Sequence, residues 1–369
     1  MNILHILYDD FRNPWFGGGG AIRNREVYKR MAKNHRITIL SGASPGAPAK
    51  EIVDGVKYCR LGVGTDVWRS LFTYSFNIFY YKDYKDYDLV IKDLLPVCPV
   101  YTPFLPKKKP VIASIQNMEY KFFEAYGVLG ILPLLNHEIS IRSYKNYLLT
   151  ANSMYDLLKK KVNKRSRITI VPYGIEEELF ENVVSEGKYI LFLGRFDIFQ
   201  KGLDTLLQAF KIVSAKYPKI ELLFAGGGKD EEKLKMMIRH LSLDRNVKFA
   251  GRVHGDKKKD IIAGSIFSCR PSRFESFGLG ALEVSACGRA VIVSDVPGNL
   301  EAVRQNETAL VVKPNDAEQL ALAMQELLEN KEKRERLGEA GRKWAKNFSW
   351  DNLARKQEEF YLGVVNNEI

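Results

Sequence analysis

The sequence predicts an α/β protein made of two doubly wound domains. Short apolar runs typical of buried parallel strands alternate with amphipathic helical segments along most of the chain. In the first half, strands are expected at 3–8 and 36–41 and a helix at 21–33, which together form a βαβ unit. The pattern begins again at an apolar strand, 189–194, and the 369 residues are enough for two domains of ordinary size.

The remaining elements continue this alternation in chain order. The segment 67–87 is unusually aromatic and is expected to form a helix buried on one side. Further strands in the first half are expected at 88–92, 110–114 and 168–171. In the second half, strands are expected at 220–225, 246–250, 265–270, 290–294 and 309–313, and helices at 203–217, 230–241, 316–329, 331–347 and 350–364.

The stretch 270–283, which reads RPSRFESFGLGALE, carries the strongest functional signal. A strand ends at Arg270, a polar loop with Glu275 follows, and the segment FGLG then opens a helix that contains Glu283. Open α/β sheets bind ligands at the carboxyl ends of their strands, and the N–H groups at a helix N-terminus suit a phosphate. Gly278 and Gly280 are therefore expected to let an anion approach the backbone closely.

A pair of cationic residues follows the strand 189–194. Arg195 and Lys201 stand in the pattern GR-x5-KG, directly before the helix 203–217. A guanidinium forks to phosphate oxygens and an ammonium acts as a point charge, so both side chains at a strand's carboxyl end suit a diphosphate. Two surface cations without a ligand are the alternative interpretation.

These motifs resemble glycosyltransferase family four, whose members are retaining enzymes with the GT-B fold. Glu275 and Glu283 match the E-x7-E motif of that family, and the text at 271–303 is similar to it throughout. The resemblance implies two Rossmann-like domains facing across a cleft, with Glu275 against the donor sugar and Glu283 holding the ribose hydroxyls. If most of the interval between them is helical, it spans roughly 12 Å, about the reach from sugar to ribose. A loop Glu followed by an exposed helix Glu is the alternative.

The resemblance also divides the chain into domains. The stretch VPYG, which ends at Gly174, is similar to the hinge of the family. It predicts an acceptor-side domain at 1–173 and a nucleotide-sugar-binding domain at 174–349. The last helix, at about 350–369, is expected to cross back onto the first domain after Trp350.

Further site residues are implied by the resemblance alone. The catalytic residues are expected to be Arg195, Lys201 and Glu275, and the donor-binding residues Gly18, Gly19, Arg252, Val253, Phe277, Gly278, Leu279 and Glu283. The glycine pair would let the backbone meet the donor, although Gly17 and Gly20 leave its register open. The region of Arg252 would clasp the nucleobase through backbone groups, and the N–H groups at 277–279 would hold the diphosphate.

On the acceptor side, the resemblance points to Gln116, Asn117 and Glu119. Gln116 stands where the family usually has a His. A Gln side chain cannot act as an acid or base, but it orients a hydroxyl by hydrogen bonds. The departure leaves the acceptor's identity more open than the class of reaction.

Composition narrows the partners. The net charge of +12 favours sugar diphosphates, lipid phosphates or an anionic membrane surface, and no recognised nucleic-acid motif supports the competing nucleic-acid interpretation. The four Cys residues lack CxxC spacing, which fits a reducing cytoplasm, and no apolar run is long enough to span a bilayer. The beginning of the chain is interpreted as a strand rather than a signal peptide.

Three segments leave membrane contact open. The aromatic segment 67–87 packs on the sheet, or it forms an acceptor groove or membrane-contacting face. The apolar segment 126–141 is a core helix, or an interfacial anchor or lid, and a cluster of Lys and Arg residues follows at 159–167. We therefore expect a cytoplasmic protein, peripheral at the inner face of the membrane if it contacts one.

The expected function is the transfer of a sugar from a UDP- or GDP-sugar to a hydroxyl of a sugar or lipid-linked acceptor, with retention of configuration, in glycan, glycolipid or cell-surface polysaccharide synthesis. No Asp-x-Asp motif stands at a suitable strand end, so neither a metal nor a cofactor is expected. A sugar-nucleotide epimerase of the same fold is the alternative. It would need acid–base side chains in the cleft, which Gln116 disfavours. A basic nucleic-acid-binding protein is a remote alternative.

Overall fold

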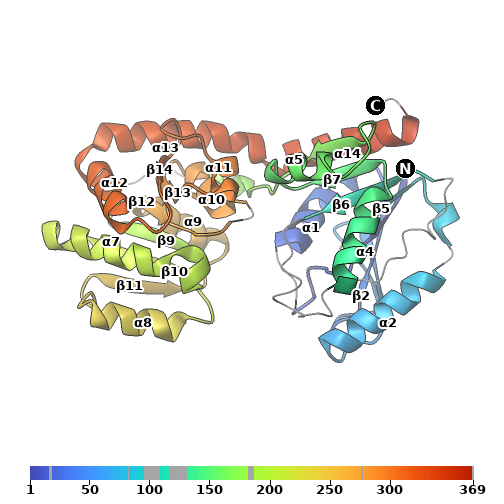
Figure 1. Cartoon of the computed structure of the whole chain (residues 1–369), viewed down its shortest axis with the longest axis horizontal. Coiled ribbons are helices and arrows are strands. Elements are labelled where there is room, and N and C mark those ends of the chain that lie inside the picture. The colour runs from blue at the N-terminus through green and yellow to red at the C-terminus, as the bar shows by residue number, and fades with distance from the viewer. Residues whose placement is uncertain are drawn as a thin grey trace. The chain divides into compact units, whose positions relative to one another are not determined.

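The computed structural model describes residues 1–15, 19–81, 83–94, 109–116, 131–181, 187–275 and 277–367. The chain divides into two compact units (Figure 1). The first unit contains Met1–Tyr173 and Trp350–Ile369, and the second contains Gly174–Ser349.

The first unit is built on an eight-stranded sheet in the order β3-β4-β2-β1-β5-β6-β7-β8. All neighbouring strands are parallel except β3 and β4, which form an antiparallel hairpin. The strands are β1 Asn2–Ile6, β2 Arg36–Gly42, β3 Lys50–Val53, β4 Val56–Leu61, β5 Leu89–Asp93, β6 Val111–Ile115, β7 Asn146–Leu149 and β8 Arg167–Ile170. The helices are α1 Gly19–Met31, α2 Val67–Tyr80, α4 Ile131–Arg142, α5 Ser153–Lys159 and α14 Trp350–Asn366, with a 3-10 turn η1 at Asp83–Asp86.

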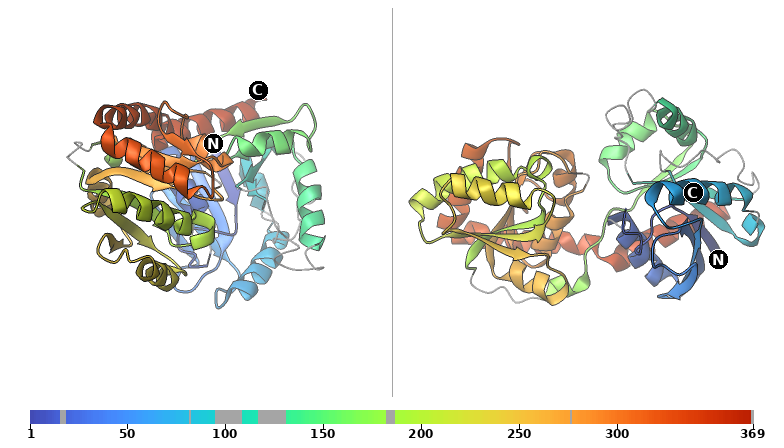
Figure 2. Two further views of the ribbon diagram at one scale, coloured as in Figure 1. Left: turned by 60° about the vertical axis from the view of Figure 1, so that its left-hand side comes forward. Right: turned by 90° about the horizontal axis from the view of Figure 1, so that it is seen from below.

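Helices cover both faces of this sheet because its central strands are apolar on both sides. Ile3 of β1 packs with α1 and α14, whereas its neighbour Leu4 packs with Tyr74 and Ile78 of α2. Successive side chains of a strand point to opposite faces, so one buried strand serves two layers. The last helix, α14, which ends the chain in red in Figure 2, therefore belongs to the core of the first unit. Its first residue, Trp350, is buried.

The second unit is built on a six-stranded parallel sheet in the order β11-β10-β9-β12-β13-β14. The strands are β9 Tyr189–Arg195, β10 Glu221–Gly227, β11 Val247–Gly251, β12 Ser265–Arg270, β13 Ala290–Ser294 and β14 Leu310–Val312. The helices are α6 Ile198–Lys201, α7 Leu203–Lys216, α8 Glu231–His240, α9 Gly255–Ala263, α10 Leu279–Ala286, α11 Pro297–Ala302, α12 Ala317–Glu329 and α13 Lys331–Ala345, with 3-10 turns η4 Glu177–Glu181 and η5 Lys346–Phe348. The strand order changes direction between β9 and β12, which is the switch point where such sheets bind ligands.

Several elements differ from the prediction. The aromatic segment is not one helix to residue 87: α2 ends at Tyr80 because Tyr81 is extended, and a separate 3-10 turn follows. The helix α11 is absent from the predicted elements; it begins at Pro297 because proline is tolerated at a first helical position. Short elements were missed altogether, namely the β3–β4 hairpin, β7, α5 and α9.

Candidate active site

The candidate site lies at the carboxyl ends of β9 and β12. Asp197 caps the short helix α6 by accepting a hydrogen bond from the Gln200 N–H at 2.9 Å, and Lys201 is the last residue of that helix. Gly202 follows with a φ of 62°, a left-handed conformation that favours glycine. A Cβ at Gly202 would lie 2.1 Å from the Pro271 carbonyl oxygen. The glycine of the KG pair therefore lets Lys201 approach the loop that follows β12.

A buried ionic cluster forms where these loops meet. Glu275 Oε1 accepts hydrogen bonds from Lys201 Nζ at 2.7 Å, from Ser272 Oγ at 3.2 Å and from Arg270 Nη2 at 3.4 Å. The Lys201, Arg270 and Glu275 side chains are 10%, 6% and 8% exposed. Two buried cations thus share one carboxylate, which leaves a surplus positive charge before any ligand binds.

The pKa of Lys201 is lowered from its ordinary 10.5, mainly because burial disfavours the charged form. The Glu275 carboxylate opposes this shift, while Arg270 and Arg195 add to it by repulsion. An anion at this site would relieve the repulsion, so the electrostatics favour a phosphate-bearing ligand.

Arg270 is a site residue that the sequence analysis missed. Its Nη1 donates to the Leu193 carbonyl of β9, and a Cβ at Gly280 would lie 2.2 Å from that Nη1. Gly280 therefore makes room for a guanidinium, and the close approach of an anion at Gly278 and Gly280 stays a prediction. Gly278 is also required by protein packing, because a Cβ there would lie 2.9 Å from the Ala302 Cβ. The alternation of side chains along β12 could have identified Arg270. Phe267 and Cys269 point into the hydrophobic core of the second unit, so Arg270 lies on the other face of the sheet.

Two of the backbone N–H groups that were expected to hold the diphosphate at the start of α10 already donate hydrogen bonds within the protein. The Gly278 N–H donates to the Gly298 carbonyl at 2.7 Å, and the Leu279 N–H donates to the Phe277 carbonyl at 2.8 Å. In this conformation these two N–H groups bind a phosphate only if they exchange those partners. Because α10 begins at Leu279, only about half of the interval from Glu275 to Glu283 lies in that helix, so the condition for the 12 Å estimate, that most of the interval is helical, is not met.

Glu283, the second carboxylate of the motif, is held by a cation from α9. Lys258 Nζ lies 3.1 Å from Glu283 Oε1 and 3.2 Å from Glu176 Oε2. Burial lowers the pKa of Lys258, but the two carboxylates raise it more, so the net shift is upward. Lys258 was not predicted as a site residue.

The remaining donor residues of the second unit lie outside the cluster. Arg195 is exposed at the end of β9 and donates to Gln200 Oε1 at 2.7 Å. Arg252 and Val253 follow β11, the edge strand of the sheet. Arg252 is exposed and its Nε would lie 3.2 Å from a Cβ at Gly227, whereas Val253 is 7% exposed.

The expected residues of the first unit are described only in part. Gly18, Asn117 and Glu119 lie outside the described residues. Gly19 opens α1, where a Cβ would lie 3.2 Å from the Tyr173 ring. Gln116 follows β6, and a Cβ at the neighbouring Gly20 would lie only 1.8 Å from its Oε1, so the glycine makes room for this amide.

A chain of buried hydrogen bonds leads from Gln116 into the core of the first unit. Gln116 Nε2 donates to Asp93 Oδ2 at 2.8 Å, and Asp93 Oδ1 lies 2.9 Å from His5 Nε2. His5 Nδ1 lies 2.8 Å from the Tyr28 hydroxyl, which lies 3.0 Å from the Tyr361 hydroxyl of α14. In one consistent assignment the Tyr361 hydroxyl donates a hydrogen bond to the Tyr28 oxygen, the Tyr28 hydroxyl donates to His5 Nδ1, and His5 Nε2–H donates to Asp93. Burial raises the pKa of both tyrosines, which keeps their hydroxyls protonated.

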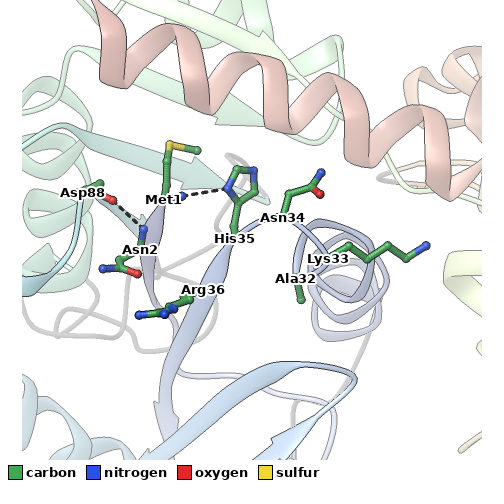
Figure 3. A pocket seen from close by; sticks show the side chains of 8 residues that line it. All are labelled: Met1, Asn2, Ala32, Lys33, Asn34, His35, Arg36 and Asp88. Carbon is green, nitrogen blue, oxygen red and sulfur yellow. Dashed lines mark hydrogen bonds between the residues drawn. The ribbon is translucent and has the colours of Figure 1, made fainter.

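A cavity of about 400 Å³ lies elsewhere in the first unit, where β1 and β2 begin (Figure 3). It is lined by Met1, Asn2, Ala32, Lys33, Asn34, His35, Arg36 and Asp88. The Met1 amine lies 3.2 Å from His35 Nδ1, and the Asn2 N–H donates to Asp88 at 2.7 Å (Figure 3). The cavity lies at the amino ends of these strands, opposite the edge at which doubly wound sheets bind ligands.

Two kinds of feature are absent from the described part of the chain. No three His, Cys, Asp or Glu side chains in the described part of the chain are grouped so as to hold a metal ion. Among the same residues, no helix combines the length and apolar character needed to cross a bilayer.

The second unit is similar in sequence to a known family of domains. Residues 175–344 match the family model of glycosyl transferases group 1. An uncharacterized glycosyltransferase of Methanocaldococcus jannaschii is 29% identical over 236 residues, which cover 62% of this chain and 64% of that protein. The phosphatidyl-myo-inositol mannosyltransferase of Mycobacterium tuberculosis is 30% identical over 206 residues, which cover 53% of this chain and 54% of that protein. The chain thus spans less than two thirds of the length of these curated relatives.

Solved structures match along nearly the whole chain. The sucrose-phosphate synthase of Thermosynechococcus elongatus has a TM-score of 0.81 at 21% identity and covers 99% of both chains. Anabaena HepE in complex with UDP has a TM-score of 0.76 at 13% identity and covers 97% of this chain and 99% of that one. The predicted α/β GT-B fold with two Rossmann-like domains is thereby confirmed. The chain resembles the GT-B glycosyltransferases of family four, and its second unit carries a glycosyl transferases group 1 domain.

Proposed function

We propose that this chain is a retaining glycosyltransferase that uses a nucleotide-sugar donor. The observation that carries the proposal is the buried cluster of Lys201, Arg270 and Glu275 at the switch point of the second sheet. Its surplus positive charge suits the diphosphate of a UDP- or GDP-sugar. The similarity to HepE, which was solved with UDP, supports a nucleotide-sugar donor.

The proposed reaction needs no nucleophile from the protein. The bond between the anomeric carbon and the diphosphate oxygen breaks while the acceptor hydroxyl oxygen bonds to the same face of the sugar. The departing phosphate takes the proton of that hydroxyl, so atoms and charge balance. Lys201 and Arg195 would stabilise the charge that develops on the leaving diphosphate, and Glu275 would position the sugar.

We propose that the reaction proceeds without a metal ion or cofactor. The cations of the candidate site would supply the leaving-group stabilisation that a divalent metal gives in other enzymes. Turnover should therefore persist after treatment with EDTA, and a loss of turnover that added Mg²⁺ or Mn²⁺ restores would overturn this part of the proposal.

The acceptor is proposed to be a sugar or lipid-linked hydroxyl near an anionic membrane surface. Trp68, Phe72 and Phe76 of α2 are 62%, 75% and 57% exposed. They recur every four residues and so share one face of the helix, while Tyr74 and Ile78 are buried on the other. The buried face fits the interpretation that the segment packs on the sheet, and we propose the membrane-contacting interpretation for the exposed face. Aromatic side chains on an exposed face of a basic protein suit a lipid interface, and the protein would then be peripheral at the inner face of the membrane.

The test of the proposed function begins with a thermal-shift screen of UDP-, GDP- and ADP-sugars, because a ligand that binds only the folded state raises its melting temperature. The selected donor is then incubated with candidate acceptors, and the anomeric configuration of the product is read by NMR. A retained configuration is expected. An inverted product would contradict the retaining mechanism, and isomerisation of the donor alone would indicate the epimerase instead.

A further inference from the structure

Lys201 forms an ion pair with Glu275 before a donor binds. The two charged groups lie 2.7 Å apart, and both side chains are at least nine-tenths buried. If Lys201 turned to a diphosphate, Glu275 would lose its shortest ion-pair contact. A buried carboxylate without a cation is strongly unfavourable, so the site needs a second partner for Glu275.

Arg270 has the position of that second partner. It belongs to the same buried cluster, with Nη2 3.4 Å from the Glu275 oxygen that Lys201 also contacts. This distance is at the long end of a hydrogen bond and leaves room to shorten. Its Nη1 is anchored on the Leu193 carbonyl, and its Nε is buried with no hydrogen-bond partner among the described residues. The guanidinium therefore stays near Glu275 and has unused hydrogen-bonding capacity.

The space for this guanidinium is provided by the start of α10. Gly280 lacks the Cβ that would lie 2.2 Å from Arg270 Nη1. Ser272, which is fully buried, donates to the same Glu275 oxygen at 3.2 Å. Two groups besides Lys201 thus hold the carboxylate in place.

We propose that Arg270 is a positioning residue that keeps Glu275 paired while Lys201 binds the donor's diphosphate. The inference rests on the proposed function and extends it by naming the group that releases Lys201. Without Arg270, the ammonium remains neutralised by Glu275 and binds a diphosphate weakly.

The test measures nucleoside diphosphate affinity of the full chain by calorimetry, with whichever of UDP, GDP and ADP raises the melting temperature most. Arg270→Gln should weaken binding by about 10- to 100-fold, the effect of a weakened charge-assisted hydrogen bond. Arg270→Lys, which keeps the charge, should weaken it less. Adding Glu275→Gln to Arg270→Gln should restore most of the affinity, because Lys201 then has no carboxylate to neutralise it.

The rescue separates positioning from a structural role. A site that had merely collapsed would not regain affinity when Glu275 is also changed, so absence of rescue overturns the inference. Gly280→Ala gives a second test if Arg270→Gln does not fold. This substitution alters no charge, and alanine favours a helix. It should displace Arg270, weaken binding and be rescued by Glu275→Gln, and unchanged affinity would overturn the inference. If the wild type binds none of the three nucleotides, the proposed function itself has failed.

Discussion

At the residue scale, Lys201 and Glu275 are the groups on which turnover should depend most. Lys201→Ala or Glu275→Ala should lower turnover by about 10²- to 10³-fold, because each removes a preorganised group from the proposed transition state. Steady-state kinetics with the selected donor give the measurement, and thermal melting checks that the variants are folded. Lys216→Ala is the matched control, since Lys216 is a half-exposed lysine paired with Glu329 elsewhere in the same unit. Near-normal turnover in both site variants would refute the assignment.

The lowered pKa of Lys201 predicts a pH dependence of binding. Below that pKa the side chain is an ammonium that attracts the diphosphate, and above it the charge is lost. Because the pKa of Lys201 in the protein without ligand lies below 10.5, the affinity for the diphosphate should begin to fall at a lower pH than it would with an ordinary lysine. Calorimetry across alkaline pH gives the measurement. Lys201→Arg should remove this fall, because a guanidinium stays charged, and an identical fall in that variant would assign it to another group.

The residue scale also shows what a sequence can and cannot predict about this site. Lys201 and Glu275 stand in recognisable motifs, and the structure brings them into contact. Arg270 and Lys258 have no motif, because their importance depends on which elements pack against them. Arg270 is one of many arginines that could end a strand, and its role is recognisable only once α10 packs beside it. Lys258 is one lysine among several in its helix, and its role is recognisable only once Glu283 lies beside it.

At the element scale, the buried strands were predictable because apolar runs bounded by glycine and polar residues are distinctive. The β3–β4 hairpin was missed, although its turn is Asp54-Gly55, with φ values of 53° and 79°. This dipeptide is a known signal for such a turn, but the half-exposed strand β3 carries a weak apolar pattern. The short helices α5 and α9 were missed because seven to nine residues give too few turns for a clear period.

The loop that presents Lys201 gives a prediction at this scale. Gly202→Ala should lower the melting temperature and nucleotide affinity together, since the new Cβ would both strain a left-handed residue and collide with the Pro271 carbonyl. We expect a loss of more than about 1 kcal/mol in the free energy of unfolding. Gly255→Ala is the matched control, because its φ is 53° but no atom lies within 4 Å of the added Cβ. Equal effects of the two substitutions would show that the close approach is unimportant.

The contact between α14 and α1 gives a second prediction for the elements. Tyr361→Phe should reduce the free energy of unfolding by about 1–3 kcal/mol, because it removes one hydrogen bond from Tyr28 and one from Gln357 in a buried network. Tyr28 keeps its contact with His5. Chemical denaturation gives the measurement. Tyr87→Phe, which removes only a 3.5 Å hydroxyl contact at a partly buried position, is the control. A Tyr361→Phe effect no larger than the control would indicate that the network contributes little.

At the scale of the whole molecule, the net charge of +12 and the exposed aromatic face of α2 predict membrane binding. The protein should float with vesicles that contain anionic lipid and float less with neutral ones. Replacing Trp68, Phe72 and Phe76 together by Gln should reduce flotation without changing nucleotide affinity. Absence of the wild type from the floated fraction in both cases would count against a membrane partner.

The architecture of the two units was predictable because strand and helix patterns alternate throughout, and the similarity to solved structures confirms the fold. The nucleobase, the sugar and the acceptor were not predictable. In the arrangement that the family resemblance implies, backbone groups and pocket shape would select the base and the sugar, and residue types indicate such contacts only weakly. On the acceptor side, Gln116 departs from the family pattern, and its environment became visible only when β1, β5 and β6 placed His5 and Asp93 beside it.

The most direct measurement is a crystal structure of the chain with the nucleoside diphosphate that binds it best. We predict a pyrophosphate oxygen within hydrogen-bond distance of Lys201 Nζ, at the carboxyl ends of β9 and β12, with Glu275 still contacted by Arg270. A pyrophosphate bound away from Lys201, or a Glu275 carboxylate separated from both cations, would contradict the account.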